Sequence, residues 1–332
     1  MKRQEDFMTL LSRRHALIAG GASMLAPGLA RAQAAWPTQP VSFVVGYAAG
    51  GGADIMAREL GHIMTPLFGQ QIVVENKGGA AGAIGARHVS NARPDGNTLF
   101  YAVSTNVVTN PHVLKTSIDT LAGLVPIIQT TDYQYVLAVN PDVPAKNAAE
   151  LIALAKKDPG KLTFSSSGVG GNNHLSGALF ADVTGIKITH VPYRGTGPAL
   201  ADVLSGVITM NFSSLPPAVG QIKAGKLKAL AVTGEKRVSS LADVPTLKEQ
   251  GINVAITGWH GLFAPPKTPD AILDRVHKDA TTAIKDPKFA AALAKDGLEM
   301  PPLQSRADFT KYVRDEHAFW GKKLKELNIQ PE

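Results

Sequence analysis

The sequence has no cysteine among its 332 residues. Disulfide bonds, thiolate nucleophiles and cysteine-ligated metal sites are therefore excluded. A lipid-bearing cysteine is absent too, so we expect an exported form of the chain to be free rather than tethered. Aromatic residues make up only 6% of the chain and charged residues 18%. The groups left for chemistry are mostly hydroxyl, amide and backbone groups.

Several catalytic patterns are also missing. No His, Asp and Glu group has metal-ligand spacing, and His260 and His317 are isolated in the sequence. Gly50–Gly52 does not fit the G-x-G-x-x-G frame of dinucleotide-binding folds, and Ser166 has no G-x-S-x-G frame. We therefore expect no cofactor, no metal and no enzymatic activity.

Residues 1–34 have the pattern of a cleaved export signal. Lys2 and Arg3 stand at the start, Arg13 and Arg14 form a twin-arginine-like pair, and an Ala- and Gly-rich run follows at 16–29. That run is too short and too weakly apolar for a stable membrane anchor. We predict cleavage after residue 34, or after residue 32, and a periplasmic location. The alternative is an amphipathic first helix of the folded domain.

The formal net charge is +7, and part of it lies in the predicted signal. The remaining charge is spread along the chain without a basic stripe, so nucleic-acid binding is not expected. A mild positive balance is compatible with anionic ligands.

Short apolar strands and helices alternate along the chain. Strands are predicted at residues 41–45, 71–75, 98–103, 134–139, 162–165, 188–191, 207–212 and 227–232. Helices are predicted at residues 53–67, 83–92, 148–157, 174–184 and 198–205, and across most of 270–327. This alternation is typical of α/β folds with a mainly parallel sheet flanked by helices.

The length favours two lobes. We predict a first lobe made of residues 35–135 and 233–332, with a second lobe, 136–232, inserted into it. Two crossing strands between the lobes would form a hinge, and a hinge implies a closing cleft. The last helix is predicted to brace the first lobe through the following side chains: Phe309, Val313, Phe319 and Leu324.

Three loops of the predicted first lobe follow parallel strands at their carboxyl ends, where open α/β sheets bind ligands. The first two also precede helices, where backbone N–H groups and the helix dipole favour an anion. Their candidate ligand-binding residues are Tyr47, Ala49, Gly50, Gly51, Gly52 and Asp54 in the first loop, Gly78, Gly79, Ala80, Ala81 and Gly82 in the second, and Ser104, Thr105 and Asn106 in the third. Asp54 either caps the helix or accepts a hydrogen bond from the ligand, and the cap is favoured. Arg58, one turn on, is expected to pair with a neighbouring acid.

The second lobe contributes candidates to the facing wall. They are Ser166, Ser167, Gly168, His174, Tyr193, Arg194, Gly195, Thr196 and Ser213. Tyr193 is suited to pack on an apolar ligand body and Arg194 to pair with a distal carboxylate. His174 is either a base or ligand contact or, as is more common, a packing or capping residue.

These loops resemble those of the Bug-type extracytoplasmic solute receptors of tripartite tricarboxylate transporters. The matching stretches are Gly50–Arg58, Val74–Gly82, Arg93–Leu99, Val191–Gly195, Ala229–Thr233, Val244–Thr246 and Gly258–Pro265. The resemblance implies a two-lobe periplasmic-binding-protein fold of the Venus-flytrap type II class. It also implies a ligand carboxylate held by backbone groups and ordered waters at 49–52 and 78–82. The chain departs from the family at Gly46-Tyr47, where Pro-Phe is frequent, and at Lys77-Gly78, where Arg-Pro is common.

The resemblance implies a solute-binding protein that captures a di- or tricarboxylic, aromatic or amino acid. Its partners would be that ligand and, transiently, the large and small membrane subunits of a transporter, and we expect a monomer. Two alternatives stay open: an exported hydrolase that uses Ser166 or Ser167 with His174, and a chemoreceptor or sensor binding protein.

Overall fold

The computed structural model describes residues 36–115 and 118–326, so the predicted export signal lies outside the described residues. The chain divides into two units, Met1–Thr38 and Gln39–Glu332, and every helix and strand described below belongs to the second. Within the described residues, no helix has the length and apolarity needed to cross a membrane.

The described strands join into one mixed sheet of nine strands with the order β2-β1-β3-β9-β4-β7-β5-β6, and β8 pairs with β4. The strands are β1 (Val41–Val45), β2 (Ile72–Asn76), β3 (Thr98–Val103), β4 (Val125–Val139), β5 (Thr163–Ser166), β6 (Thr189–Pro192), β7 (Met210–Ser214), β8 (Lys228–Val232) and β9 (Thr257–Ala264). The prediction of an α/β fold is confirmed.

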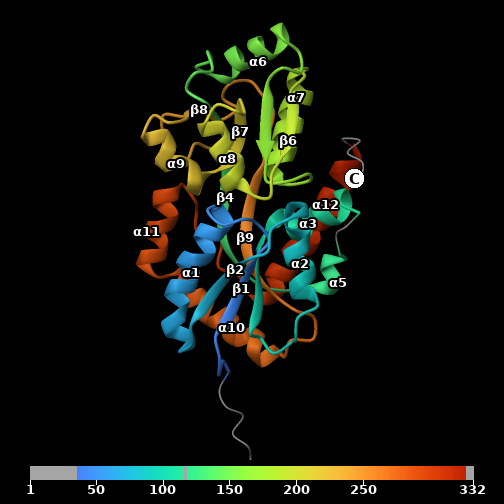
Figure 1. The fold of residues 1–332 in the computed structure, drawn as a ribbon. Coiled ribbons are helices and arrows are strands. Elements are labelled where there is room, and N and C mark those ends of the chain that lie inside the picture. Colours follow the sequence, from blue (N-terminus) through green and yellow to red (C-terminus); the bar gives the residue numbers. More distant parts are fainter. Residues whose placement is uncertain (1–35, 116–117, 327–332) are drawn as a thin grey trace, which may run out of the picture. The chain divides into compact units, whose positions relative to one another are not determined.

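Helices cover both faces of this sheet (Figure 1). The first-lobe helices are α1 (Gly52–Phe68), α2 (Ala83–Ser90), α3 (Ser104–Val108), α4 (Asn110–Val113), α5 (Thr120–Gly123), α10 (Asp270–Ile284), α11 (Pro287–Asp296) and α12 (Arg306–Glu326). The second-lobe helices are α6 (Ala148–Lys157), α7 (Asn172–Thr184), α8 (Thr196–Leu204) and α9 (Leu215–Lys223). Two short 3-10 turns, η1 (Ala80–Gly82) and η2 (Ser239–Leu241), complete the set.

The strand directions are more mixed than predicted. β1 pairs in parallel with β2 and β3, and β5 pairs in parallel with β6 and β7. The central strands β4 and β9, however, make antiparallel pairs with each other and with β3, β7 and β8. The sheet of each lobe is therefore parallel at its outer edge and antiparallel where the lobes join.

β9 was missed by the sequence prediction, although it lies between β3 and β4. Gly258 and Gly261 interrupt its apolar pattern, and both are needed for packing. A Cβ atom would lie 2.6 Å from the Tyr133 ring at position 258, and 2.9 Å from the Phe309 ring at position 261. Aromatic rings from neighbouring elements occupy the space where side chains at these two positions would lie. The strand therefore needs glycine there, and the alternation of apolar and polar residues that marks a strand is lost from its sequence.

β4 passes from one lobe to the other. Residues Val125–Gln134 pair with β9, and Tyr135–Val139 pair with β7. The strand lies between two separate apolar cores, and Val136 and Ala138 of its second half belong to the second of them. The first core includes Phe100, Trp259 and Phe309, and the second includes Val136, Leu200 and Val219.

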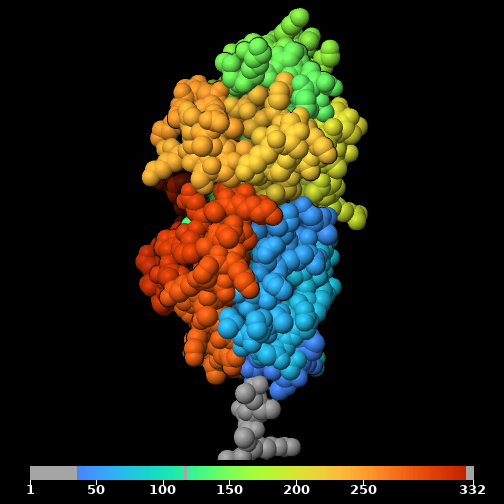
Figure 2. All heavy atoms as spheres, turned by 90° about the vertical axis from the view of Figure 1, so that its left-hand side faces the viewer, coloured from blue at the N-terminus to red at the C-terminus, as the bar shows by residue number. Residues whose placement is uncertain are grey.

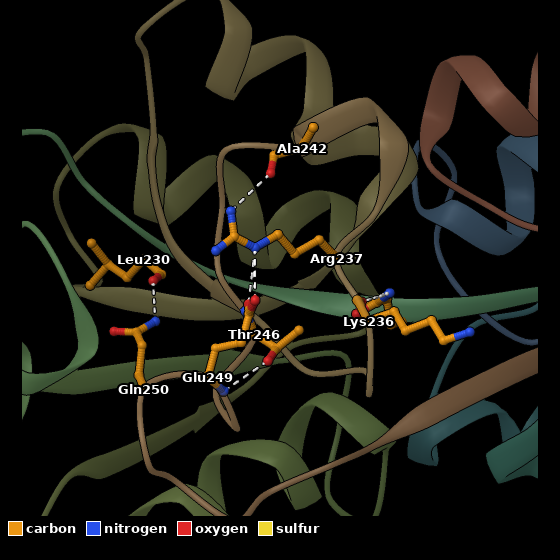
Figure 3. Close-up of polar contacts among 8 residues, drawn as sticks. Leu230, Lys236, Arg237, Ala242, Thr246, Glu249 and Gln250 are labelled. Atoms are coloured by element: carbon orange, nitrogen blue, oxygen red, sulfur yellow. Dashed lines mark hydrogen bonds and ion pairs between the residues drawn. The ribbon is translucent and has the colours of Figure 1, made fainter.

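The segment after β8 stays with the second lobe (Figure 3). Val238 and Leu241 are buried in the second core. Arg237 Nε donates to both Glu249 carboxylate oxygens at 3.1 and 3.0 Å, and Gln250 Nε2 donates to the Leu230 carbonyl at 2.9 Å. These contacts favour a second lobe that runs from the change of β4 partners to about residue 256. We propose this boundary in place of residue 232.

α12 packs against the first-lobe core, where Phe309 and Val313 are fully covered and Leu324 is buried. The prediction for Phe319 was wrong, because 59% of this residue is exposed. The buried residues of α12 are Phe309, Val313 and Leu324, and the helical period does not place Phe319 on the same side of the helix. Phe319 therefore lies at the edge of the face that contacts the core.

Candidate functional site

A small cavity lies between the lobes, with a volume of about 30 Å³, room for about two water molecules. It is lined by Tyr47, Gly51, Gly52, Ala53, Val103, Thr105, Tyr133, Tyr135, Ser167, Asn172, Asn173, Thr196, Ser214 and His260. Both lobes contribute to this lining. Six of the predicted site residues are among them: Tyr47, Gly51, Gly52, Thr105, Ser167 and Thr196.

The lobes are closed over this cavity. The Ala48 N–H donates to the Arg194 carbonyl at 3.1 Å, and Asn172 Nδ2 donates to Ser104 Oγ at 3.3 Å. In Figure 2 the blue atoms, from the N-terminal part of the first lobe, directly meet yellow atoms of the second lobe. The cavity is thus an interior space of a closed conformation, and a ligand larger than a few atoms needs the walls to move apart.

Five helices begin at the cavity, the five-residue α3 and four longer ones. Residues at the starts of α1, α7, α8 and α9 line it, and none of these four helices has a side-chain cap. The first N–H groups of a helix have no acceptor within the helix, and the helix dipole places partial positive charge there. Among the described lining residues none is Lys or Arg. Partial positive charge at the cavity would therefore come from backbone groups, although Pro216 and Pro217 leave the first turn of α9 with fewer N–H groups.

Gly52 and Ser214 face each other at two of these helix starts. A Cβ atom at position 52 would lie 2.8 Å from Ser214 Oγ. Ser214 is 8% exposed, and its Oγ has no hydrogen-bond partner. Its neighbour Ser213, which was the predicted residue, does not line the cavity and donates its hydroxyl to the Ser214 carbonyl at 2.9 Å. Ser214 is therefore the better candidate.

The second glycine-rich loop supports the site from behind. The Ala81 carbonyl accepts hydrogen bonds from Tyr47 Oη at 2.9 Å and from the Asn106 and Asn110 amides at 2.8 Å. Ala81 has φ 47°, in the left-handed region that non-glycine residues rarely occupy. These three donors hold a strained carbonyl in place, so this loop and Asn106 act as scaffold behind Tyr47.

The other predicted loop residues divide between contact and rim positions. Gly78 packs beside the Arg194 carbonyl oxygen, which would lie 3.1 Å from a Cβ atom at position 78. Gly168 packs beside Ala81, whose backbone nitrogen would lie 3.0 Å from a Cβ atom at position 168. Ala49, Gly50 and Ala80 are exposed, Gly79 is half-buried, and Gly82 and Ser104 are buried, but none of them lines the cavity.

Asp54 has a structural role, but it is not the helix cap that was favoured, because α1 has no side-chain cap. Its carboxylate accepts the Gly50 N–H at 2.9 Å, the Arg58 guanidinium at 2.8 Å and the Asn76 amide at 2.9 Å. Burial alone would raise its pKa, but these partners outweigh burial and hold the pKa of Asp54 below its usual range. The expected pairing of Arg58 with a neighbouring acid is confirmed.

Tyr133, Tyr135 and His260 line the cavity and were missed. Tyr133 and Tyr135 alternate along β4, so both point to the same face of the strand. Tyr135 Oη donates to Tyr133 Oη at 3.2 Å, and the Tyr133 ring stacks on His260 with centroids 4.6 Å apart. Burial raises the pKa of both tyrosines and lowers the pKa of His260 to about 3, so all three are neutral. The Tyr-x-Tyr spacing was the available signal.

The serine–histidine arrangement differs from the proposed hydrolase. Ser166 Oγ lies 2.6 Å from His190 Nε2 and is fully buried, outside the cavity lining. His174 stacks on His190 with centroids 4.0 Å apart, and its Nδ1 accepts the Gly170 N–H at 3.1 Å. His174 thus packs and accepts within its own lobe. Ser166 is thus buried away from the cavity and cannot attack a bound substrate. Ser167 lines the cavity, but its hydroxyl donates to Asn173 Oδ1 at 2.9 Å and not to His174.

Three predicted contacts of the second lobe are turned away. Arg194 is exposed, and its carbonyl rather than its guanidinium meets the first lobe. Tyr193 packs against the second core and donates its hydroxyl to Asp202. Gly195 is buried against Ala48, at the seam between the lobes. In this closed structure, none of the three lines the cavity.

Comparison with solved structures finds the same fold. The periplasmic binding protein BugD is 32% identical, with a TM-score of 0.86 over 90% of this chain and 100% of that one. A Rhodopseudomonas palustris protein with adipate is 30% identical, with a TM-score of 0.85 over 90% and 100% of the two chains. MatC from Rhodopseudomonas palustris, with bound malate, is 27% identical, with a TM-score of 0.82 over 86% and 99%. The two-lobe binding-protein fold is confirmed.

The family model of the tripartite tricarboxylate transporter family receptor matches residues 56–329. That match covers most of the chain and both lobes, including α7, α8 and α9 at the cavity. This protein belongs to the tripartite tricarboxylate transporter receptor family, the TctC or Bug-type solute-binding proteins.

Proposed function

We propose that this protein binds a small carboxylate in the cavity between its lobes and delivers it to a membrane transporter. The observation that carries the proposal is the meeting of four uncapped helix starts at one cavity with neutral side chains. Backbone N–H groups and aligned helix dipoles favour a negative group there. The adipate and malate bound by two similar proteins support the same ligand class.

Binding is proposed to occur without turnover. The buried serine–histidine pair is outside the cavity, and the cavity-lining histidine is neutral with its Nδ1 2.6 Å from Thr131 Oγ1. Among the described residues that line the cavity, Ser167 donates its hydroxyl to Asn173 Oδ1 at 2.9 Å, so no serine there is paired with a histidine. Family membership supports a binding role, since the related proteins are solute-binding proteins.

Two finer points complete the proposal. Residues 1–34 would direct export to the periplasm and be removed, which agrees with the periplasmic location stated for BugD. The partners would be the large and small membrane subunits implied by the receptor family, contacted transiently by the closed form.

Isothermal titration calorimetry on the protein lacking residues 1–34 tests the ligand class. We expect saturable binding for at least one small carboxylate and none for the matching diol or diamide. NMR of the recovered ligand should show it unchanged. Binding of neutral analogues with equal affinity, or consumption of the ligand, would overturn the proposal.

A further inference from the structure

The two walls of the cavity differ in the state of their hydrogen-bond donors. The helix-start wall, formed by Gly52, Ala53, Thr196 and Ser214, has donors without acceptors. Ser214 Oγ is buried and has no partner, and the first N–H groups of α1 have no acceptor within the helix. A buried donor without a partner is costly, and a bound carboxylate would satisfy several at once.

The opposite wall, formed by Tyr133, Tyr135, Asn172 and His260, has polar side chains that already have hydrogen-bond partners within the protein. Tyr135 Oη donates to Tyr133 Oη at 3.2 Å, and Tyr133 in turn bonds to Ser104. The Asn172 amide donates to Ser104 Oγ at 3.3 Å and also bonds to Tyr135. A carboxylate at this tyrosine wall would have to break these bonds to gain donors of its own.

No positive charge stands at the tyrosine wall among the described residues. His260 is fully buried between the rings of Tyr101 and Tyr133, with centroids 5.4 and 4.6 Å away. Burial lowers its pKa to about 3, so it stays neutral at physiological pH. Arg194, which the sequence suggested for a distal carboxylate, is exposed and not part of the lining.

Resting on the proposed function, we propose that the ligand is a monocarboxylate. Its carboxylate binds the helix-start wall, and its other end is uncharged and packs against the tyrosine wall. A second carboxylate there would lose its hydration without gaining an unpaired donor or a cation, a strongly unfavourable exchange. The similar proteins with adipate and malate carry dicarboxylates, so this selectivity would be a property of this chain.

The test compares ligands of equal length that differ only at one end. Calorimetric titrations of the protein without residues 1–34 use three pairs: 4-hydroxybutyrate with succinate, 6-hydroxyhexanoate with adipate, and 4-(hydroxymethyl)benzoate with terephthalate. In every pair that binds, we expect the monocarboxylate to bind at least tenfold more tightly. A dicarboxylate that binds as tightly as its partner overturns the inference but leaves the proposed function intact. Binding of none of the six acids refutes both.

Two variants assign the selectivity to its wall. Ser214→Ala should weaken the binding of both ligands of a pair by the same factor, because both place a carboxylate at the helix-start wall. Tyr133→Phe removes the acceptor of the Tyr135 hydroxyl and frees that donor, so the preference for the monocarboxylate should narrow at least threefold. An unchanged preference in Tyr133→Phe would contradict the role of the paired donors.

Discussion

A Cβ atom on Gly197, near the start of α8, would lie 2.9 Å from the Ala49 carbonyl oxygen in the facing lobe. The next nearest atoms also belong to the backbone, at Gly50. Neither side of this contact has a side chain that could rotate away. Gly197 is therefore one of the positions that determine how closely the two lobes approach.

Gly197→Ala should hinder closure and weaken ligand binding at least tenfold, because the new methyl group would meet the Ala49 carbonyl. Calorimetric titration measures the loss, and the unfolding temperature of the ligand-free protein should barely change. Gly220→Ala in α9 is the matched control, since a Cβ atom there meets nothing within 4 Å. Wild-type affinity in Gly197→Ala would show that the closed seam does not limit binding.

Ser214→Ala should weaken carboxylate binding by about tenfold, equivalent to about 1.4 kcal/mol, because it removes one hydrogen bond to a charged group. The ligand-free protein should be as stable as the wild type or slightly more stable, since the lost hydroxyl has no partner. Ser213→Ala is the neighbouring control, because its hydroxyl bonds to a carbonyl away from the cavity. Equal effects on affinity in both variants would argue against the assignment to Ser214.

Arg194→Ala should change the affinity for mono- and dicarboxylates by less than twofold. The guanidinium is exposed, and the contact across the seam is made by the main-chain carbonyl, which alanine retains. Parallel titrations with 6-hydroxyhexanoate and adipate measure both affinities. A loss confined to adipate would restore the role that the sequence suggested for this side chain.

Asp132→Asn should stabilise the protein above about pH 6. Burial, together with Glu299 and Glu316, raises the pKa of Asp132 to about 6. In the unfolded chain the carboxyl ionises near pH 4, about 3.9. The folded protein thus keeps the Asp132 proton up to a higher pH than the unfolded chain does. The free energy of unfolding therefore falls as the pH rises from about 4 to about 6.

Urea unfolding at several pH values checks this sign. The variant should match the wild type near pH 4 and exceed it at pH 8 by an amount on the order of 1 kcal/mol. Asp142→Asn, at an exposed position, serves as the control for the loss of one surface charge. A stability difference that does not grow with pH would show that the pKa of Asp132 in the folded protein is not raised.

The first-lobe part of the site was accessible from sequence because its signal is local. Gly51 and Gly52 stand between a strand and a helix, and that order alone places bare N–H groups at a helix start. Ser214 was not accessible in this way. Choosing between Ser213 and Ser214 requires the end of β7 to within one residue, and neighbouring residues of a strand point to opposite faces.

The tyrosine wall depended on a longer strand than the pattern indicated. The predicted strand began at residue 134, whereas β4 begins at Val125, so Tyr133 fell outside the prediction. His260 lies on β9, whose glycines hid it. Both misses concern the strands that join the lobes, where packing between distant segments replaces the simple alternation of a surface strand.

β4 has a consequence for how the molecule loses its structure. Residues Val125–Gln134 and Tyr135–Val139 of this one strand pair with different neighbours in different lobes. Melting either lobe would strip the pairing from half of a strand that the other lobe needs. The two cores should accordingly denature as one cooperative unit, and a calorimetric scan should trace one endotherm instead of two.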